Sequence, residues 1–87
     1  MKAVKGSVVC SKAGRDKGYL LCVVGQEDEF FILADGNERP LQNPKRKNKK
    51  HVAVTSCVLT PQQMSANKAL KRALREVSLM PDRLEDN

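Results

Sequence analysis

The chain of 87 residues has few aromatic residues, one histidine and no paired cysteines, and each shortage excludes a class of protein. One Tyr, two Phe and no Trp are too few for the several exposed stacking platforms that binders of single-stranded nucleic acid use. The single histidine, His51, follows five cations, and the cysteines form no Cys-x-x-Cys pair, so no usual zinc site is predicted. No Gly-rich phosphate-binding motif is present. We therefore expect no enzyme, no cofactor, no metal and no small-molecule substrate.

Long apolar segments are also missing. No stretch approaches the roughly 20 apolar residues that span a bilayer. The N-terminal segment has neither the apolar region nor the small-residue cleavage site of a secretory signal. We therefore expect a cytoplasmic protein without a membrane partner. Cys10, Cys22 and Cys57 each lie in an apolar run, where a free cysteine behaves as a small hydrophobic residue, so we expect buried structural thiols.

Positive charge is what the chain has in excess. The net charge is +6, which favours a polyanionic partner. Residues 1–60 hold 11 basic and 6 acidic side chains. Residues 61–75 hold 4 basic and no acidic side chains, and residues 76–87 hold 1 basic and 4 acidic side chains. The densest cluster is "NPKRKNKKHV" (43–52), which has five cations and no acid. Asn43, Pro44 and Asn48 favour a loop that presents this charge without forming a regular strand.

Short apolar runs separated by turn residues predict a small β domain over residues 1–59. The runs 6–11, 19–25, 28–36 and 51–59 are rich in aliphatic residues and are predicted strands. Residues 38–42 fit a short edge strand, because Pro40 cannot donate a ladder hydrogen bond. Four or five such strands indicate a small antiparallel barrel. Its core candidates include Val9, Val23, Ile32 and Val54.

Residues 60–79 predict an amphipathic C-terminal helix. The segment "TPQQ" (60–63) offers a cap, a proline at the first helical position and a capping-box glutamine, and Ser65 is a rival cap. Pro81 cannot continue the helix, and residues 80–87 are expected to form a flexible acidic tail. At helical spacing the apolar face comprises Ala66, Ala69, Leu70, Ala73, Leu74 and Val77, and the opposite basic face comprises Lys68, Lys71, Arg72 and Arg75.

The segment "GSVVCSKAGRDKGYLLCVV" (6–24) resembles the KOW motif, in which a strand, a loop with a basic residue and glycines, and an aliphatic strand follow one another. Gly18 matches the characteristic glycine of the motif, with Gly14 before it. Both are expected at turn positions with positive φ, which glycine reaches without steric cost. The second strand, "YLLCVV", departs from the alternation of polar and apolar residues that is typical after the glycine.

The resemblance extends to residues 4–55 and carries implications for fold and function. KOW domains are SH3-like barrels found in ribosomal proteins and transcription elongation factors. The loop "AGRDKG" is similar to that of large-subunit ribosomal KOW proteins, and the whole span is similar to small stand-alone bacterial KOW proteins that bind RNA. The resemblance thus implies a mostly β fold, an SH3-like barrel followed by the helix. It also implies binding to structured RNA, ribosomal RNA above all, in a translation or ribosome-associated role.

Two alternatives stand beside RNA binding. KOW domains in transcription factors also dock on polymerase, so the chain is alternatively a protein-interaction module with ribosomal or polymerase proteins as partners. The second and weaker alternative is non-specific DNA binding. For RNA, the scarcity of aromatic residues favours phosphate contacts and recognition of shape. The expected contacts come from two loops and comprise Lys12, Arg15, Lys17, Lys45, Arg46, Lys47, Lys49 and Lys50. The basic helix face is a secondary candidate.

Overall fold

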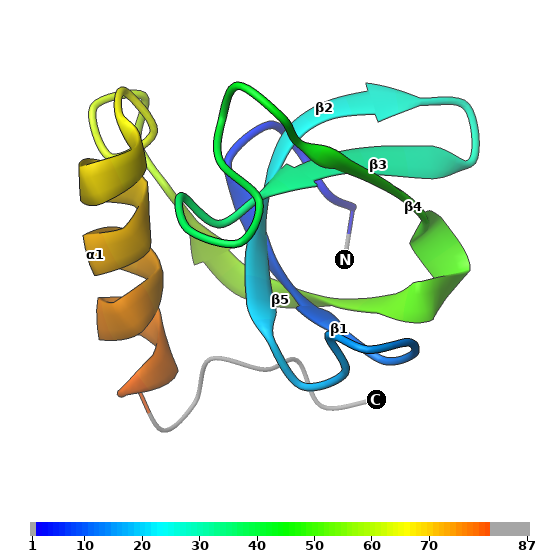
Figure 1. The fold of residues 1–87 in the computed structure, drawn as a ribbon. Coiled ribbons are helices and arrows are strands. Elements are labelled where there is room, and N and C mark those ends of the chain that lie inside the picture. Colours follow the sequence, from blue (N-terminus) through cyan, green and yellow to red (C-terminus); the bar gives the residue numbers. More distant parts are fainter. Residues whose placement is uncertain (1, 81–87) are drawn as a thin grey trace.

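A computed structural model describes residues 2–80 and shows a five-stranded antiparallel sheet with one helix packed on it (Figure 1). The mostly β class with a C-terminal helix is therefore confirmed. The strands are β1 (Ser7–Ser11), β2 (Leu20–Glu27), β3 (Phe30–Ala34), β4 (Lys45–Asn48) and β5 (Val52–Val58). A short 3-10 helix, η1 (Lys49–His51), joins β4 to β5, and the helix α1 comprises Asn67–Ser78. No helix among these residues is long and apolar enough to cross a membrane.

The sheet is an antiparallel meander of β1 to β4, and the last strand, β5, pairs with β1. The order is β4-β3-β2-β1-β5, so β4 and β5 are its two edges and the sheet of residues 2–80 is open. The predicted closed barrel is thus not shown. The register shifts between Val23 and Gly25 in β2, and again between Ser7 and Val9 where β1 pairs with β5. Such irregularities bend the strands that carry them and increase their twist.

The three central strands are buried on both faces. One face packs against α1, with Val8, Cys22 and Ala34 in the same apolar cluster as the buried residues of the helix. The other face belongs to a second cluster, which comprises Val9, Leu21, Val23, Phe31, Leu33 and Val52. A strand covered on both sides needs apolar residues at successive positions. This double burial explains why "LLCVV" does not alternate.

The predicted core is partly wrong. Val9 and Val23 are fully buried, and Val54 is half-buried but packs against the second cluster. Ile32 is half-buried and belongs to neither cluster. Successive side chains of a strand point to opposite faces. In β3, Phe31 and Leu33 fill the second cluster, and Ile32 lies on the opposite face, where its Cβ is close to Gly25. The prediction of Ile32 as a core residue is therefore wrong, because within the continuous run "FFIL" it is Phe31 and Leu33 that face the second cluster.

Burial of the thiols was also predicted too broadly. Cys22 is buried, whereas Cys10 and Cys57 are half-buried, and all three are free. Cys10 pairs with Ala53 of the edge strand β5. Cys57 lies on that same edge strand, beside the cluster under α1. An edge strand has one neighbour only, which leaves Cys57 partly accessible.

The position of the fourth strand differs from the prediction. Residues 38–42 form no strand, and the backbone turns here because Asp35 Oδ1 accepts N–H bonds from Asn37 and Arg39, both at 2.8 Å. Residues 45–48 of the predicted basic loop are instead β4, paired with β3 in a register that places Lys47 opposite Phe31. Basic residues are common on edge strands because they prevent further pairing. The basic run is thus a strand followed by a 3-10 turn.

The first helical residue is Asn67, six residues after the predicted first position, Pro61, and two residues after the rival cap Ser65. The capping pair forms, with Gln63 N–H donating to Thr60 Oγ1 at 3.2 Å and Thr60 N–H donating to Gln63 Oε1 at 2.9 Å, but it closes a turn ahead of the helix. The N-cap is Ala66, with no side-chain hydrogen bond. Asn67 Oδ1 accepts the Leu41 N–H at 2.7 Å, which ties the helix start to the β3–β4 connection.

The two faces of α1 are as predicted except at Ala66, which is the exposed N-cap, and at Ala69, which is half-buried. Leu70, Ala73, Leu74 and Val77 are buried against the sheet, and the four cations of the opposite face are exposed. The apolar face is thus covered by the sheet of the same chain. The predicted acidic tail lies outside the described residues, apart from Met80.

Candidate nucleic-acid interface

The loop between β1 and β2 is a tightly hydrogen-bonded turn. Gly14 and Gly18 have φ values of 86° and 89°, the left-handed conformation that glycine adopts without strain. The Gly18 N–H donates to the Ser11 carbonyl at 2.8 Å, and the Tyr19 N–H donates to the Asp16 carbonyl at 2.9 Å. The turn therefore presents its side chains from a backbone that hydrogen bonds hold in place.

Asp16 ties this loop to β4. Its Oδ1 accepts hydrogen bonds from Ser11 Oγ at 2.7 Å and from Lys47 Nζ at 2.9 Å, and its Oδ2 accepts one from Lys45 Nζ at 3.1 Å. Lys47 Nζ also donates to the Ala13 carbonyl at 2.8 Å. We call Asp16, Ser11, Lys45 and Lys47 the Asp16 cluster. It fastens the first loop to a strand about 30 residues later in the chain.

The Asp16 cluster holds its carboxylate ionised. Partial burial raises the pKa of Asp16, but hydrogen bonds from Ser11, Lys47 and Lys45, together with the charge of Lys45, outweigh it. The net effect lowers the pKa of Asp16 well below its ordinary value. At neutral pH the carboxylate is therefore charged and neutralises part of the nearby positive charge.

A second set of backbone bonds holds η1 against the neighbouring turns. The Lys12 N–H donates to the His51 carbonyl at 2.8 Å, and the Lys49 N–H donates to the Glu29 carbonyl at 2.9 Å. Asn48 Oδ1 caps η1 by accepting the Lys50 N–H at 3.0 Å. The β1–β2 loop and η1 therefore lie side by side at one end of the sheet, which we call the basic end.

Five of the eight predicted contact residues lie on the β1–β2 loop and on η1, which a backbone hydrogen bond joins. Among residues 2–80, none of the five takes part in an ion pair. Four of them are exposed or partly exposed on the loop and η1, and Lys49 is half-buried with its ammonium 5.2 Å from the Phe31 ring centroid. The five are Lys12, Arg15, Lys17, Lys49 and Lys50.

The three cations of β4 have other roles. The Lys47 side chain is only 8% exposed and is held by Asp16, so little of it is available for a phosphate contact. Lys45 is 27% exposed and shares the same carboxylate. Arg46 points to the other face, where it pairs with Glu27 at 3.2 Å and lies 3.9 Å over the Phe30 ring. The sequence alone did not show this division, because all three belong to one run of charge.

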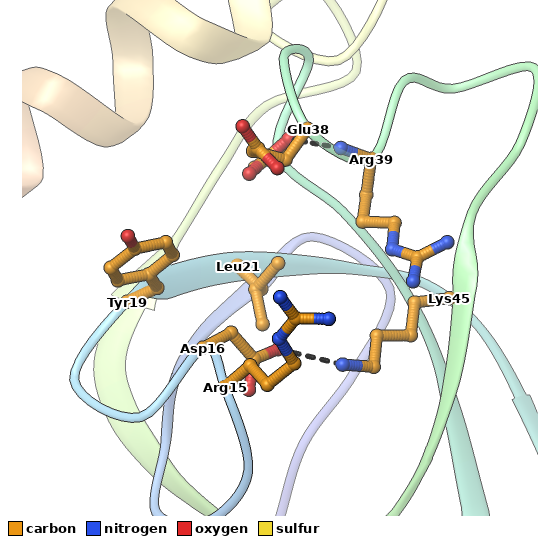
Figure 2. Close-up of a pocket in the computed structure, with 8 residues that line it drawn as sticks. Arg15, Asp16, Tyr19, Leu21, Glu38, Arg39 and Lys45 are labelled. Atoms are coloured by element: carbon orange, nitrogen blue, oxygen red, sulfur yellow. Dashed lines mark hydrogen bonds and ion pairs between the residues drawn. The ribbon is translucent and has the colours of Figure 1, made fainter.

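A cleft beside the basic end contains residues that the sequence did not single out. It has a volume of about 390 Å³ and lies between the β1–β2 loop, β2 and the β3–β4 connection. Figure 2 shows Tyr19 at one side, Arg39 and Lys45 at the other, and Leu21 between them. Sequence reasoning missed Tyr19 because it begins an apolar run that is typical of a strand. Its place directly after the turn glycine, one residue before β2 begins, was the available signal.

The four cations of α1 divide into two pairs. Lys71 and Arg75 line a second cleft, which Tyr19 also borders, whereas Arg72 lines a different hollow with Gln62. The helix therefore has one pair of cations near Tyr19, and Lys68 and Arg72 are outside both Tyr19 clefts.

Comparison with protein-family models gives no match for this chain, and comparison with curated proteins gives none either.

Proposed function

We propose that this chain is an RNA-binding protein of the KOW type. It contacts structured RNA, ribosomal RNA above all, through the basic end, in a translation or ribosome-associated role in the cytoplasm. The observation that carries the proposal is the backbone bond from Lys12 to His51, which joins two loops that are distant in sequence. The five cations of these loops have no ion-pair partners among residues 2–80. Such a surface favours phosphate contacts, which position a protein on nucleic acid without reading sequence.

The size of the molecule fits this role. Its principal extents are 30 × 28 × 23 Å, so the cations of the basic end reach neighbouring phosphates of one RNA. The aromatic residues Phe30 and Phe31 are covered by Arg46 and Lys49 and offer no stacking surface here. Charge and shape, rather than base sequence, are therefore what the basic end reads.

The fold is compatible with the SH3-like barrel that the KOW resemblance implies. We propose that the open sheet is a small barrel of this class, with its opening between β4 and β5, which only η1 connects. Two register shifts bend the strands, and the second apolar cluster fills the side away from α1. The helix then covers the outside of the barrel.

The test is the affinity for a structured RNA hairpin. Replacing Lys12 and Lys50 by Gln should weaken binding to all structured RNAs about equally, and the salt slope of log K should become shallower by about 1 for each cation removed. The matched control replaces Lys2 and Lys5, which are exposed, carry the same charge and lie in the N-terminal segment. Both double variants have the same net charge, so a difference in their RNA affinity shows that the position of the lysines matters and not the total charge alone.

The outcomes also separate RNA binding from protein docking. Equal affinities for the two double variants would contradict a specific basic end. Binding to a ribosomal or polymerase protein that persists at high salt would favour the protein-interaction module, because an apolar interface does not depend on counterion release.

A further inference from the structure

Tyr19 is an exposed aromatic platform with a fixed backbone. Its side chain is 56% exposed, whereas Phe31 is 4% exposed and Phe30 is covered by Arg46 at 3.9 Å. The Tyr19 N–H donates to the Asp16 carbonyl, and its own carbonyl accepts the Ser11 N–H at 3.0 Å. An exposed ring on a hydrogen-bonded turn loses little conformational entropy when another flat group stacks on it.

Cations flank this ring on two sides. The cleft of about 390 Å³ on one side holds Arg15, Arg39 and Lys45. The cleft on the other side, about 530 Å³, holds Lys71 and Arg75 of α1. Tyr19 borders both clefts, and Figure 2 shows how its ring stands apart from the cations of the first. The ring is therefore a ridge between two hollows, each lined by cations and by an equal number of acids.

Both clefts also contain acids: Asp16, Asp35 and Glu38 line the first, and Asp35 and Glu38 line the second. Asp16 is occupied by its cluster, and Asp35 Oδ1 accepts the backbone N–H groups of Asn37 and Arg39. Glu38 borders both clefts beside Tyr19. A carboxylate repels a phosphate but accepts a hydrogen bond from the amino group of a base. The ridge thus favours a base beside Tyr19 and Glu38, and leaves phosphates to the arginine and lysine side chains of the two clefts.

We propose that Tyr19 stacks one unpaired nucleobase of a structured RNA. The phosphate on one side of that nucleotide is held by Arg15 and Arg39, and the phosphate on the other side by Lys71 and Arg75. This inference rests on the proposed function and deepens it, because it names the RNA feature that is recognised. A single platform accommodates a single base, so a bulged or flipped nucleotide is the ligand rather than a single strand.

The first experiment compares two RNA hairpins that differ only in one bulged 2-aminopurine nucleotide. The wild-type chain should bind the bulged hairpin more tightly than the fully paired one and quench the fluorescence of the analogue by stacking. Tyr19→Ala should lower the affinity for the bulged hairpin by about 5- to 100-fold and leave the paired hairpin unchanged. Tyr19→Phe should bind as the wild type does, and circular dichroism checks that each variant is folded.

The helix supplies a second experiment with a matched control. Lys71→Gln with Arg75→Gln should weaken binding of the bulged hairpin more than Lys68→Gln with Arg72→Gln. Both pairs lie on the basic face of α1 and remove the same charge, but only Lys71 and Arg75 line the cleft beside Tyr19.

Three results would overturn the inference. The first is equal affinity of the wild type for both hairpins, and the second is equal loss in the two helix variants. The third is a Tyr19-dependent affinity for a cationic peptide with no such dependence for the bulged hairpin, which would make the ridge a protein site. Binding of the paired hairpin reports the proposed function separately, because it depends on Lys12 and Lys50 and not on Tyr19.

Discussion

Replacing Asp16 by Asn should destabilise the fold, although Asp16 lies in a loop. The substitution keeps the size of the side chain and removes its charge. The new side chain would present an amide group to two ammonium groups that can only donate hydrogen bonds. Lys47, at 8% exposure, would keep only neutral acceptors among the residues that the structure describes, the Ala13 carbonyl and the amide oxygen of the new side chain. A nearly buried cation would then be left without a counter-charge.

The size of the effect follows from this burial. Removing one partner of a buried ion pair costs about 3–5 kcal/mol, and a hydrogen bond to a charged group contributes about 1.5–3 kcal/mol. The Asp16 side chain is 15% exposed and Lys45 is 27% exposed, so water replaces part of what is lost. We therefore expect a loss of about 2–3 kcal/mol in the free energy of unfolding. For a chain of this length, that corresponds to a fall in Tm of about 10–20 °C.

Urea unfolding followed by circular dichroism measures this loss. The control is Glu27→Gln, which breaks the exposed Arg46–Glu27 pair and should change stability by less than about 0.5 kcal/mol. A double-mutant cycle with Lys47→Met should give a coupling of about 1–3 kcal/mol. An unchanged unfolding midpoint for Asp16→Asn would refute the reasoning, because it would mean that the cluster contributes nothing to the fold.

The pH dependence of the same transition has a definite sign. The folded chain holds the pKa of Asp16 well below that of the unfolded chain, where an aspartate has a pKa of about 3.9. The contribution of Asp16 is therefore fully present above that value and is lost as pH falls below it toward the folded pKa. Wild type should lose more stability than Asp16→Asn between about pH 5 and pH 2, and parallel curves would contradict the lowered pKa.

Three further predictions concern the turns, the helix and the core. Gly36→Ala should lower the free energy of unfolding more than Gly18→Ala, because a Cβ at Gly36 meets the Asn67 carbonyl oxygen whereas a Cβ at Gly18 meets nothing within 4 Å. Equal losses of about 1 kcal/mol, the cost of positive φ alone, would contradict this prediction. Leu74→Asp should lower helicity in far-ultraviolet circular dichroism, since it places a charge in the cluster under α1, and unchanged helicity would show that the helix needs no packing. Cys22, whose pKa is raised to about 12 by burial, should resist alkylation until unfolding, and labelling in the folded state as fast as at Cys10 would contradict the two-sided core.

The sequence was informative where local rules decide the structure. Turn glycines and aliphatic runs placed four of the five strands, and helical periodicity identified the buried and exposed faces of α1. The start of the helix was misplaced because the capping pair at Thr60 and Gln63 closes an isolated turn. What decides the true start is Asn67, whose side chain bonds to Leu41 and Gln42 far away in the chain. A contact across 25 or more residues leaves no local signal.

The candidate site was harder to predict for the same reason. The charge of the run 43–52 was visible, but its division into available and occupied cations depends on tertiary contacts. Lys45 and Lys47 lie on the side of β4 that faces Asp16, whereas Arg46, between them in sequence, faces away. Tyr19 acquires its setting only when α1 and the β3–β4 connection come beside it. Local composition thus predicts which charges exist and not which of them are free to bind.

A salt titration of RNA affinity tests the central claim most directly. If three to five cations of the basic end each neutralise a phosphate, log K for a structured RNA should fall with log salt concentration with a slope of about −2 to −5. Replacing Lys12, Lys17 and Lys50 by Gln should flatten that slope by about 3 at most, with little change in Tm because all three are outside ion pairs among residues 2–80. A slope and an affinity that are the same in this variant and in the wild type would contradict the account and show that RNA is not bound at the basic end.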